Sequence, residues 1–146
     1  MAAPKPAPIG SIILGLTGGI GAGKSSVAKT LVTALEALLL DADALVGQLL
    51  QVSQVIDSIE LTLGSSVRTG AGCIDRNLLS ALIFHDAIAR AKVEKVLHPR
   101  VRQKIWQGLA KFELERPGGF VVLDIPLLRE VGLDKICDQT LHVHVL

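Results

Sequence analysis

The chain has 146 residues, and its 15 Lys and Arg against 14 Asp and Glu give a formal net charge of +1. This near-neutral balance argues against a general nucleic-acid coat and a polybasic membrane binder, so any affinity for anions has to come from local geometry. Apolar residues make up 49% of the chain and its mean hydropathy is +0.48, which is ample for a packed core and argues against disorder. The length favours one domain.

No segment of the sequence reaches the ~18 consecutive apolar residues that span a bilayer, since the apolar segment 31–40 contains a glutamate and is followed by an aspartate. Residues 1–8 lack the apolar stretch of a secretory signal, and their three prolines predict an extended, mobile tail. Cys73 and Cys137 stand in no metal-binding or redox spacing. We therefore predict a soluble, cytoplasmic protein without a membrane or nucleic-acid partner, whose oligomeric state the sequence leaves open.

The first predicted elements are a buried strand, a glycine-dense turn and a helix. Residues 12–16 form a short apolar run bounded by glycines, which is typical of a strand buried on both faces. After the glycines of 18–23, the spacing becomes helical from Lys24 onward, through Val27, Leu31, Leu35 and Leu38. Residues 38–40 could instead form a second short strand before Asp41, although no glycine stops the helix ahead of them.

The middle of the chain has mostly helical spacing. One or two helices should end at Gly64, and Asp75 should cap the N-terminus of another. A further helix is predicted roughly over 86–97. His98-Pro99 should then start a new helix, because the residue before proline disfavours helical backbone angles.

Two strands are predicted after the turn at 117–119. Residues 120–123 form a buried apolar run that ends at Asp124, and the alternation of apolar and polar residues over 141–145 predicts a strand with one wet face. The order of strand, helix, strand, helical stretch and two strands is that of a parallel α/β sheet with a helical insertion.

These elements predict a single domain over 9–146. Its core would comprise 9–43 and 117–146, and the helical insertion would span 44–116.

Eight consecutive residues between the first strand and helix fit the pattern G-x-x-x-x-G-K-[ST], namely Gly18, Gly19, Ile20, Gly21, Ala22, Gly23, Lys24 and Ser25. Glycines let the backbone turn its N–H groups inward around phosphate oxygens, and the helix N-terminus adds a partial positive charge. Lys24 can then reach the β- and γ-phosphates of ATP, and the Ser25 hydroxyl can ligate Mg²⁺. We predict that these residues, together with Ser26, bind ATP.

The competing interpretation of this segment is a glycine turn with an incidental surface lysine. A cation in the first turn of a helix opposes the helix dipole unless an anion binds there. The position of Lys24 therefore favours phosphate binding.

Three aspartates at predicted strand ends are candidate catalytic or metal-binding groups. If the chain is extended, Asp41 and Asp43 share one side at the carboxyl edge of the sheet. A kinase needs a carboxylate at this edge, either to take the proton of the substrate hydroxyl or to orient that hydroxyl. Asp43 could equally cap the following helix. Asp124 ends a buried strand, as a Walker-B aspartate does, and could hold Mg²⁺, although a turn-initiating role is the alternative.

Five segments together resemble a known family. They are residues 15–25, Asp41-Ala42-Asp43-Ala44, Asp75-Arg76 with Leu79 and Ile83-Phe84, Leu97-His98-Pro99, and Leu123-Asp124-Ile125-Pro126-Leu127-Leu128. In this order they resemble the GLTGGIG-x-GKS loop, DAD segment, DR-x-x-L helix, LHP turn and DIPLL strand end of the dephospho-CoA kinases.

The resemblance implies a P-loop NTPase-type parallel sheet in three layers (αβα) with an acceptor-binding helical insertion. It implies transfer of the γ-phosphate of ATP to the 3′-hydroxyl of dephospho-CoA, the last step of coenzyme A biosynthesis. By the same likeness, Lys24 and the loop amides bind ATP, Ser25 ligates Mg²⁺, and Asp43 is the base near the 3′-hydroxyl.

The sequence departs from the family pattern at several points. The family continues beyond the strand that ends at Leu146 with an arginine-bearing lid, a fifth strand and a closing helix, so the resemblance implies a C-terminally shortened chain. Ser80 stands where the family often has arginine, and Arg129 replaces an aromatic residue. Three basic residues could meet acceptor phosphates or form a solvated helix face, namely Arg76, Arg100 and Arg102.

Two alternatives remain open: another small-molecule kinase with the same loop, and a nucleotide-binding module that is inactive for lack of its lid. A regulatory GTPase is disfavoured because the chain contains no N-K-x-D motif. His142 and His144 could bind zinc as an H-x-H pair but fit better as polar residues on the wet face of an edge strand. Trp106 fits the apolar stripe of a helix.

Overall fold

A computed structural model of the protein describes residues 10–19, 23–125 and 133–144. The chain forms two compact units, one made of Met1–Asp43 and Arg102–Leu146 and the other of Ala44–Val101. The division falls within the long helix α5 (Ala87–Glu115). The helical insertion expected from the sequence, residues 44–116, stays a prediction.

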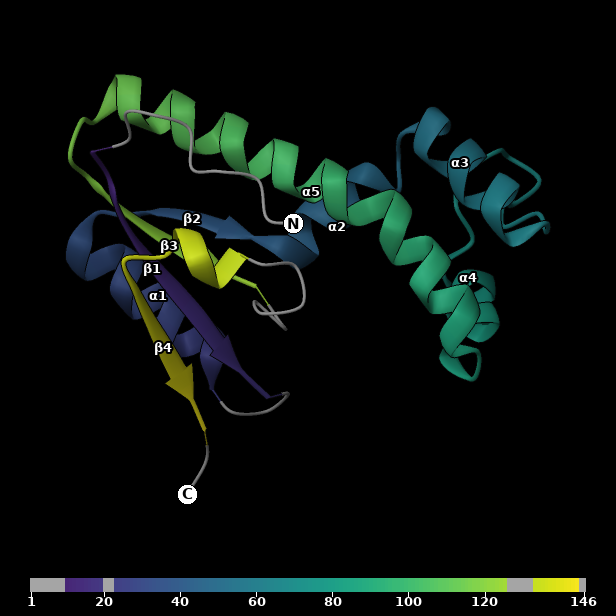
Figure 1. The fold of residues 1–146 in the computed structure, drawn as a ribbon, viewed down its shortest axis with the longest axis horizontal. Helices are drawn as coiled ribbons and strands as arrows, with labels where there is room; N and C mark the ends of the chain where they lie inside the picture. The colour runs from purple at the N-terminus through teal and green to yellow at the C-terminus, as the bar shows by residue number, and fades with distance from the viewer. Residues whose placement is uncertain (1–9, 20–22, 126–132, 145–146) are drawn as a thin grey trace. The chain divides into compact units, whose positions relative to one another are not determined.

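The first unit contains a parallel four-stranded sheet (Figure 1). Its strands are β1 (Ile12–Gly18), β2 (Leu38–Asp41), β3 (Phe120–Asp124) and β4 (Gln139–Val143), and the 3₁₀ helix η1 (Leu133–Ile136) precedes β4. The strand order is β2-β3-β1-β4, with every neighbouring pair parallel. The predicted parallel α/β sheet is thus confirmed, and its carboxyl ends meet at one edge.

Helix α1 (Lys24–Leu35) covers one face of this sheet. Leu16 of β1, Ala28 of α1 and Val122 of β3 form a buried apolar cluster there. The helical spacing from Lys24 therefore has the physical cause that the sequence suggested, since the apolar stripe of α1 is removed from water against the sheet.

The C-terminal half of α5 covers the opposite face. Val122 faces α1, so the next residue of β3, Leu123, faces the other way. Leu40 of β2 is the register partner of Leu123 and therefore faces the same side as Leu123. A Cβ atom at Gly108 of α5 would lie 3.0 Å from Leu40 Cδ2, so helix and strand are in close contact (Figure 1). The sheet lies between two helical layers, as the αβα prediction requires.

The link between α1 and β2 corrects one prediction and confirms another. Leu38 was counted in the helical stripe, but α1 ends at Leu35. Leu38 instead begins β2, which is the second short strand predicted for residues 38–40. Glu36 adopts the left-handed conformation (φ 48°, ψ 44°) that usually requires glycine at a helix end, and its carbonyl accepts a hydrogen bond from Arg116 Nη1 at 2.9 Å. The sequence lacked the usual glycine signal because Glu36 takes its place.

The second unit contains most of α2 (Ala42–Leu49), α3 (Ser53–Leu63), α4 (Arg76–Phe84) and the first half of α5. Gly64 ends α3 in the left-handed conformation at φ 71°, as predicted. The Asp75 carboxylate accepts a hydrogen bond from the Leu78 N–H at 3.0 Å and so caps α4, also as predicted.

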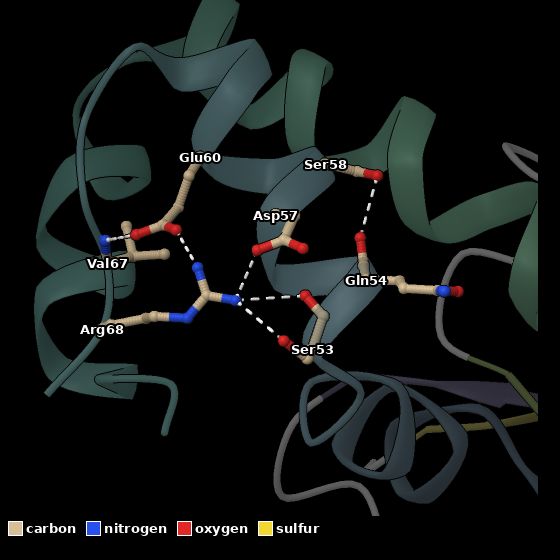
Figure 2. A network of polar contacts seen from close by, with 7 residues as sticks. All are labelled: Ser53, Gln54, Asp57, Ser58, Glu60, Val67 and Arg68. Carbon is tan, nitrogen blue, oxygen red and sulfur yellow. Dashed lines mark hydrogen bonds and ion pairs between the residues drawn. The ribbon is translucent and has the colours of Figure 1, made fainter. Parts of the chain in front are cut away.

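Arg68 ties the segment after α3 to that helix (Figure 2). Its guanidinium pairs with Asp57 at 2.6 Å and with Glu60, and it donates to two oxygens of Ser53 at 3.2 Å. Glu60 also accepts a hydrogen bond from the Val67 N–H at 2.8 Å, which is the main reason that the pKa of Glu60 lies below its ordinary value. These contacts fix the loop that leads to α4.

Helix α5 corrects a second prediction, because it runs unbroken through Pro99. A proline inside a helix removes one backbone hydrogen bond and crowds the preceding turn. Here Arg100 Nη1 donates to the Val96 carbonyl at 2.6 Å in that turn, and Leu97 and Val101 on either side are buried. Packing of the apolar stripe outweighs the local preference of proline for a helix end.

Although α5 has 29 residues, its charged side chains make it too polar to cross a bilayer. Across the three described ranges, no helix combines the length and apolar character of a membrane span.

Candidate functional site

The carboxyl end of β1 leads directly into the glycine-rich loop. Gly19 follows β1, and Gly23 precedes α1 with a left-handed backbone at φ 85°, a conformation that a residue with a Cβ atom rarely adopts. Ile20, Gly21 and Ala22, which the sequence assigned to ATP binding, lie outside the described residues. The described part of the loop therefore joins the strand to the helix as the phosphate-loop pattern requires.

Gly18 is required by a close contact with β4 rather than by its backbone angles. A Cβ atom at Gly18 would lie 2.5 Å from the Val143 carbonyl oxygen, well inside van der Waals contact. A Cβ atom at Gly19 would meet nothing within 4 Å. The two adjacent glycines therefore differ: Gly18 permits the close pairing of β1 with β4, whereas a Cβ atom at Gly19 would have open space around it.

Among the described residues, the N-terminus of α1 has neither a side-chain cap nor an acidic residue in its first turn. Ser25 and Ser26, both predicted to bind ATP, lie exposed in this turn. The N–H groups at such a helix end suit an anion such as a phosphate.

Lys24 forms an ion pair with Asp124 at the end of β3. Lys24 Nζ lies 3.1 Å from Asp124 Oδ1, and the two side chains are 16% and 11% exposed. Asp124 Oδ1 is buried and accepts no hydrogen bond from the described residues, so the ammonium group supplies its compensating charge. Sequence analysis predicted both residues as functional but did not foresee that they contact each other.

The Asp124 carboxylate meets the chemical requirements of a magnesium ligand. Mg²⁺ prefers carboxylate and hydroxyl oxygens, and is usually bound through one or two carboxylates together with substrate phosphates. The buried Asp124 carboxylate oxygen, which pairs with a cation, and the Ser25 hydroxyl in the first turn of α1 provide such a donor set. The residues present therefore fit the ion that the sequence predicted.

Asp41 and Asp43 do not lie on one strand, which corrects the extended geometry expected for them. Strand β2 ends at Asp41, and Asp43 belongs to the first turn of α2. Asp41 Oδ1 accepts a hydrogen bond from the Asp43 N–H at 2.9 Å, so Asp41, and not Asp43, caps the helix. The Asp43 side chain is exposed.

The strand register brings the aspartates to the same edge of the sheet. Asp41 is the register partner of Asp124 across the β2–β3 pair. Two neighbouring strands thus end in aspartates, β2 in Asp41 and β3 in Asp124, and Lys24 at the start of α1 pairs with Asp124. Ligands bind at this carboxyl edge in open α/β sheets.

Two of the basic residues that the sequence singled out bind backbone carbonyl groups of the second unit. Arg76 Nη2 donates to the Gly47 carbonyl at 3.4 Å, and Arg100 Nη1 donates to the Val96 carbonyl, both within the second unit. Arg102 belongs to the first unit, and Arg129 lies outside the described residues.

The histidines predicted on the last strand do not form a metal site with other residues. The rings of His142 and His144 stack with centroids 5.6 Å apart. Over 10–19, 23–125 and 133–144, no group of three or more potential metal-ligating side chains occurs. Both histidines are exposed, and β4 is the edge strand that the sequence suggested.

Comparison with known proteins identifies close relatives. A protein-family model described as dephospho-CoA kinase (CoaE) matches residues 12–146. A protein named dephospho-CoA kinase from Symbiobacterium thermophilum is 40% identical over 129 residues, which are 87% of this chain and 53% of that protein. One of the same name from Thermobifida fusca is 37% identical over 133 residues, 90% of this chain and 64% of the relative.

Solved structures share the fold. The crystal structure of TT1252 from Thermus thermophilus aligns with a TM-score of 0.73 and 35% identity, covering 92% of this chain and 65% of that one. A dephospho-CoA kinase from Campylobacter jejuni aligns with a TM-score of 0.65 and 22% identity, which supports the fold alone. The chain spans about half to two thirds of the length of these relatives.

Proposed function

The chain belongs to the dephospho-CoA kinase family, and we propose on this premise that it transfers the γ-phosphoryl group of ATP to the 3′-hydroxyl of dephospho-CoA. The product would be coenzyme A, formed in the last step of its biosynthesis. The observation within the chain that carries the proposal is the Lys24–Asp124 ion pair beside the glycine-rich loop. It brings the cation that would bind phosphate and the carboxylate that would hold the metal to one point at the carboxyl edge of the sheet.

Lys24 and the backbone of α1 would bind the phosphates. The N–H groups at the start of α1 have no side-chain cap, so they can donate to phosphate oxygens. When a nucleotide binds, the Lys24 ammonium group can leave the Asp124 carboxylate and bind the β- and γ-phosphate oxygens instead, because both partners are anionic. It would then stabilise the charge that develops on these oxygens during transfer.

Asp124 and Ser25 are the residues that would hold Mg²⁺. Once Lys24 has moved to the phosphates, the buried Asp124 Oδ1 needs another cation. The chemistry that Mg²⁺ would supply when held there is neutralisation of phosphate charge during transfer.

Asp43 is the group we assign to the acceptor hydroxyl. Its carboxylate is exposed in the first turn of α2, and it makes no hydrogen bond with any residue in the described part of the chain. Asp43 would accept the proton of the 3′-hydroxyl while the hydroxyl oxygen forms its bond to the γ-phosphorus. The bond from that phosphorus to the β-phosphate oxygen breaks at the same time, and ADP leaves.

The proposal is tested by incubating the 146-residue chain with ATP, Mg²⁺ and dephospho-CoA and measuring coenzyme A. We expect product from the unaltered chain and from the control Glu115→Gln, whose side chain is exposed at the end of α5. Lys24→Ala should lower the rate by about 10²–10³-fold, and Asp43→Asn by about 10²–10⁴-fold.

The choice of acceptor separates this function from its alternatives. Faster phosphorylation of a nucleoside monophosphate or of shikimate than of dephospho-CoA would identify a different small-molecule kinase. ATP binding without phosphorylation of any of these acceptors would identify a nucleotide-binding module. A cytoplasmic location stays a prediction from the sequence.

A further inference from the structure

The structure contains a direct link between the two aspartates of the Asp41-Ala42-Asp43 segment. Asp41 Oδ1 accepts a hydrogen bond from the Asp43 N–H at 2.9 Å. Asp41 is the last residue of β2, and Asp43 lies in the first turn of α2. The Asp41 side chain therefore fixes the turn through which the backbone passes from the sheet into the helix.

The position of Asp41 is in turn fixed by the sheet. Strand β2 pairs in parallel with β3 from Leu38 to Asp41, and the last register pair is Asp41 with Asp124. Asp124 also holds Lys24 in an ion pair. A short series of contacts thus runs from the phosphate-binding lysine through two strand ends to the first turn of α2.

We propose that Asp41 is a positioning residue, whose carboxylate holds the first turn of α2 so that the Asp43 carboxylate keeps a fixed place relative to Lys24 and Asp124. This inference rests on the proposed function, because it takes Asp43 as the group that meets the acceptor hydroxyl. The exposed Asp43 side chain has no hydrogen-bond partner of its own among the described residues, so its orientation depends on the backbone that carries it.

The role of Asp41 is to accept a hydrogen bond, and a negative charge is not needed for it. Asparagine caps helices about as well as aspartate, because its side-chain oxygen accepts the same hydrogen bond, whereas alanine accepts none. If Asp41 instead acted through its charge, for example toward a cation at Asp124, asparagine and alanine would be equally damaging.

The experiment compares Asp41→Asn with Asp41→Ala in the ATP and dephospho-CoA assay. The matched control is Asp86→Ala, which removes the same kind of cap at the start of α5. Asp86 Oδ1 accepts a hydrogen bond at 3.0 Å from the N–H of Ile88, two residues ahead, just as Asp41 does from Asp43. Asp41→Ala should lower kcat by about 10- to 100-fold, the loss expected when a reacting group is misplaced by about 1 Å, with the KM for ATP nearly unchanged. Asp41→Asn should retain kcat within about threefold, and Asp86→Ala within about twofold.

A second measurement does not depend on turnover. Hydrogen exchange of the Asp43 amide, followed by NMR, should be slow in the unaltered chain and in Asp41→Asn but fast in Asp41→Ala. If the unaltered chain makes no coenzyme A, the proposed function fails, and the exchange rates still show whether Asp41 holds the turn.

Three results would overturn the inference. They are an Asp41→Asn variant as slow as Asp41→Ala, an Asp41→Ala variant with unchanged kcat, and an Asp43 amide that exchanges equally fast in all variants.

Discussion

Lys24 Nζ lies 3.1 Å from Asp124 Oδ1, so the lysine of the phosphate loop is held by the aspartate that ends β3. Both side chains are largely buried, and removal of either one leaves the other without its compensating charge. This pairing connects the stability of the sheet edge to the residues that would bind ATP.

A double-mutant cycle tests this pairing in the absence of nucleotide. We expect Lys24→Met and Asp124→Asn each to lower the free energy of unfolding, and the two changes together to cost less than their sum. The coupling free energy should be about 1–3 kcal/mol, measured by urea unfolding. Additive effects of the two substitutions would contradict an ion pair between these residues.

The two glycines at the end of β1 should respond differently to alanine. Gly18→Ala places a Cβ atom against the Val143 carbonyl oxygen, and because both belong to paired strands the backbone has to move. We expect a loss of about 1–3 kcal/mol in the free energy of unfolding. Gly19→Ala, whose Cβ atom meets nothing within 4 Å, serves as the control and should change stability by no more than about 0.5 kcal/mol.

Replacing Pro99 by alanine should stabilise the protein. Pro99 is exposed inside α5, and alanine would restore the missing N–H group to the helix at little other expense. The expected gain is about 2 kcal/mol, the helix penalty of proline less the entropy that proline removes from the unfolded chain. The exposed position Gln103 in the same helix offers a control, because Gln103→Ala should leave the unfolding midpoint in urea almost unchanged. A destabilised Pro99→Ala variant would show that the proline is needed for packing.

Glu113 should make the stability of the first unit depend on pH. Its carboxylate accepts hydrogen bonds from the Ser11 hydroxyl and from the Gly10 N–H, and these, led by Ser11, hold the pKa of Glu113 below its ordinary value. A carboxylate with a lowered pKa in the folded state stabilises the protein above its unfolded-state pKa, and this contribution is lost as pH falls through the folded-state value.

The unfolding temperatures of the unaltered chain and Glu113→Gln should therefore differ at pH 7 and converge in the acid range. Glu115→Gln provides the comparison, since Glu115 is exposed in the same helix. A difference that stays constant down to pH 3 would contradict the role of Glu113.

Much of the fold could be predicted from the sequence because its strongest signals are local. The apolar strand runs and the Asp75 cap each require particular residue types at fixed spacing, and the structure contains both. Pro99 and Glu36 were harder to predict, since both adopt conformations that their local preferences disfavour. Contacts with residues distant in the sequence, such as Arg116 with the Glu36 carbonyl, compensate for these preferences.

The candidate site was predicted residue by residue but not as a set of contacts. The pattern around Lys24 identified the loop, yet nothing local indicates that Asp124, a hundred positions later, pairs with it. The capping role of Asp41 had a recognisable signal, an aspartate directly before a helical segment. The extended geometry assumed for residues 41–43 concealed it.

The central claim is that the loop before α1 binds ATP through Lys24, and the most direct test is a calorimetric titration of ATP in Mg²⁺. The unaltered chain and the edge-strand control His142→Ala should bind ATP with equal affinity. Lys24→Ala should bind about 30-fold or more weakly, as expected when the partner of a desolvated charge is removed. Equal binding by Lys24→Ala, or no binding by the unaltered chain, would contradict the account.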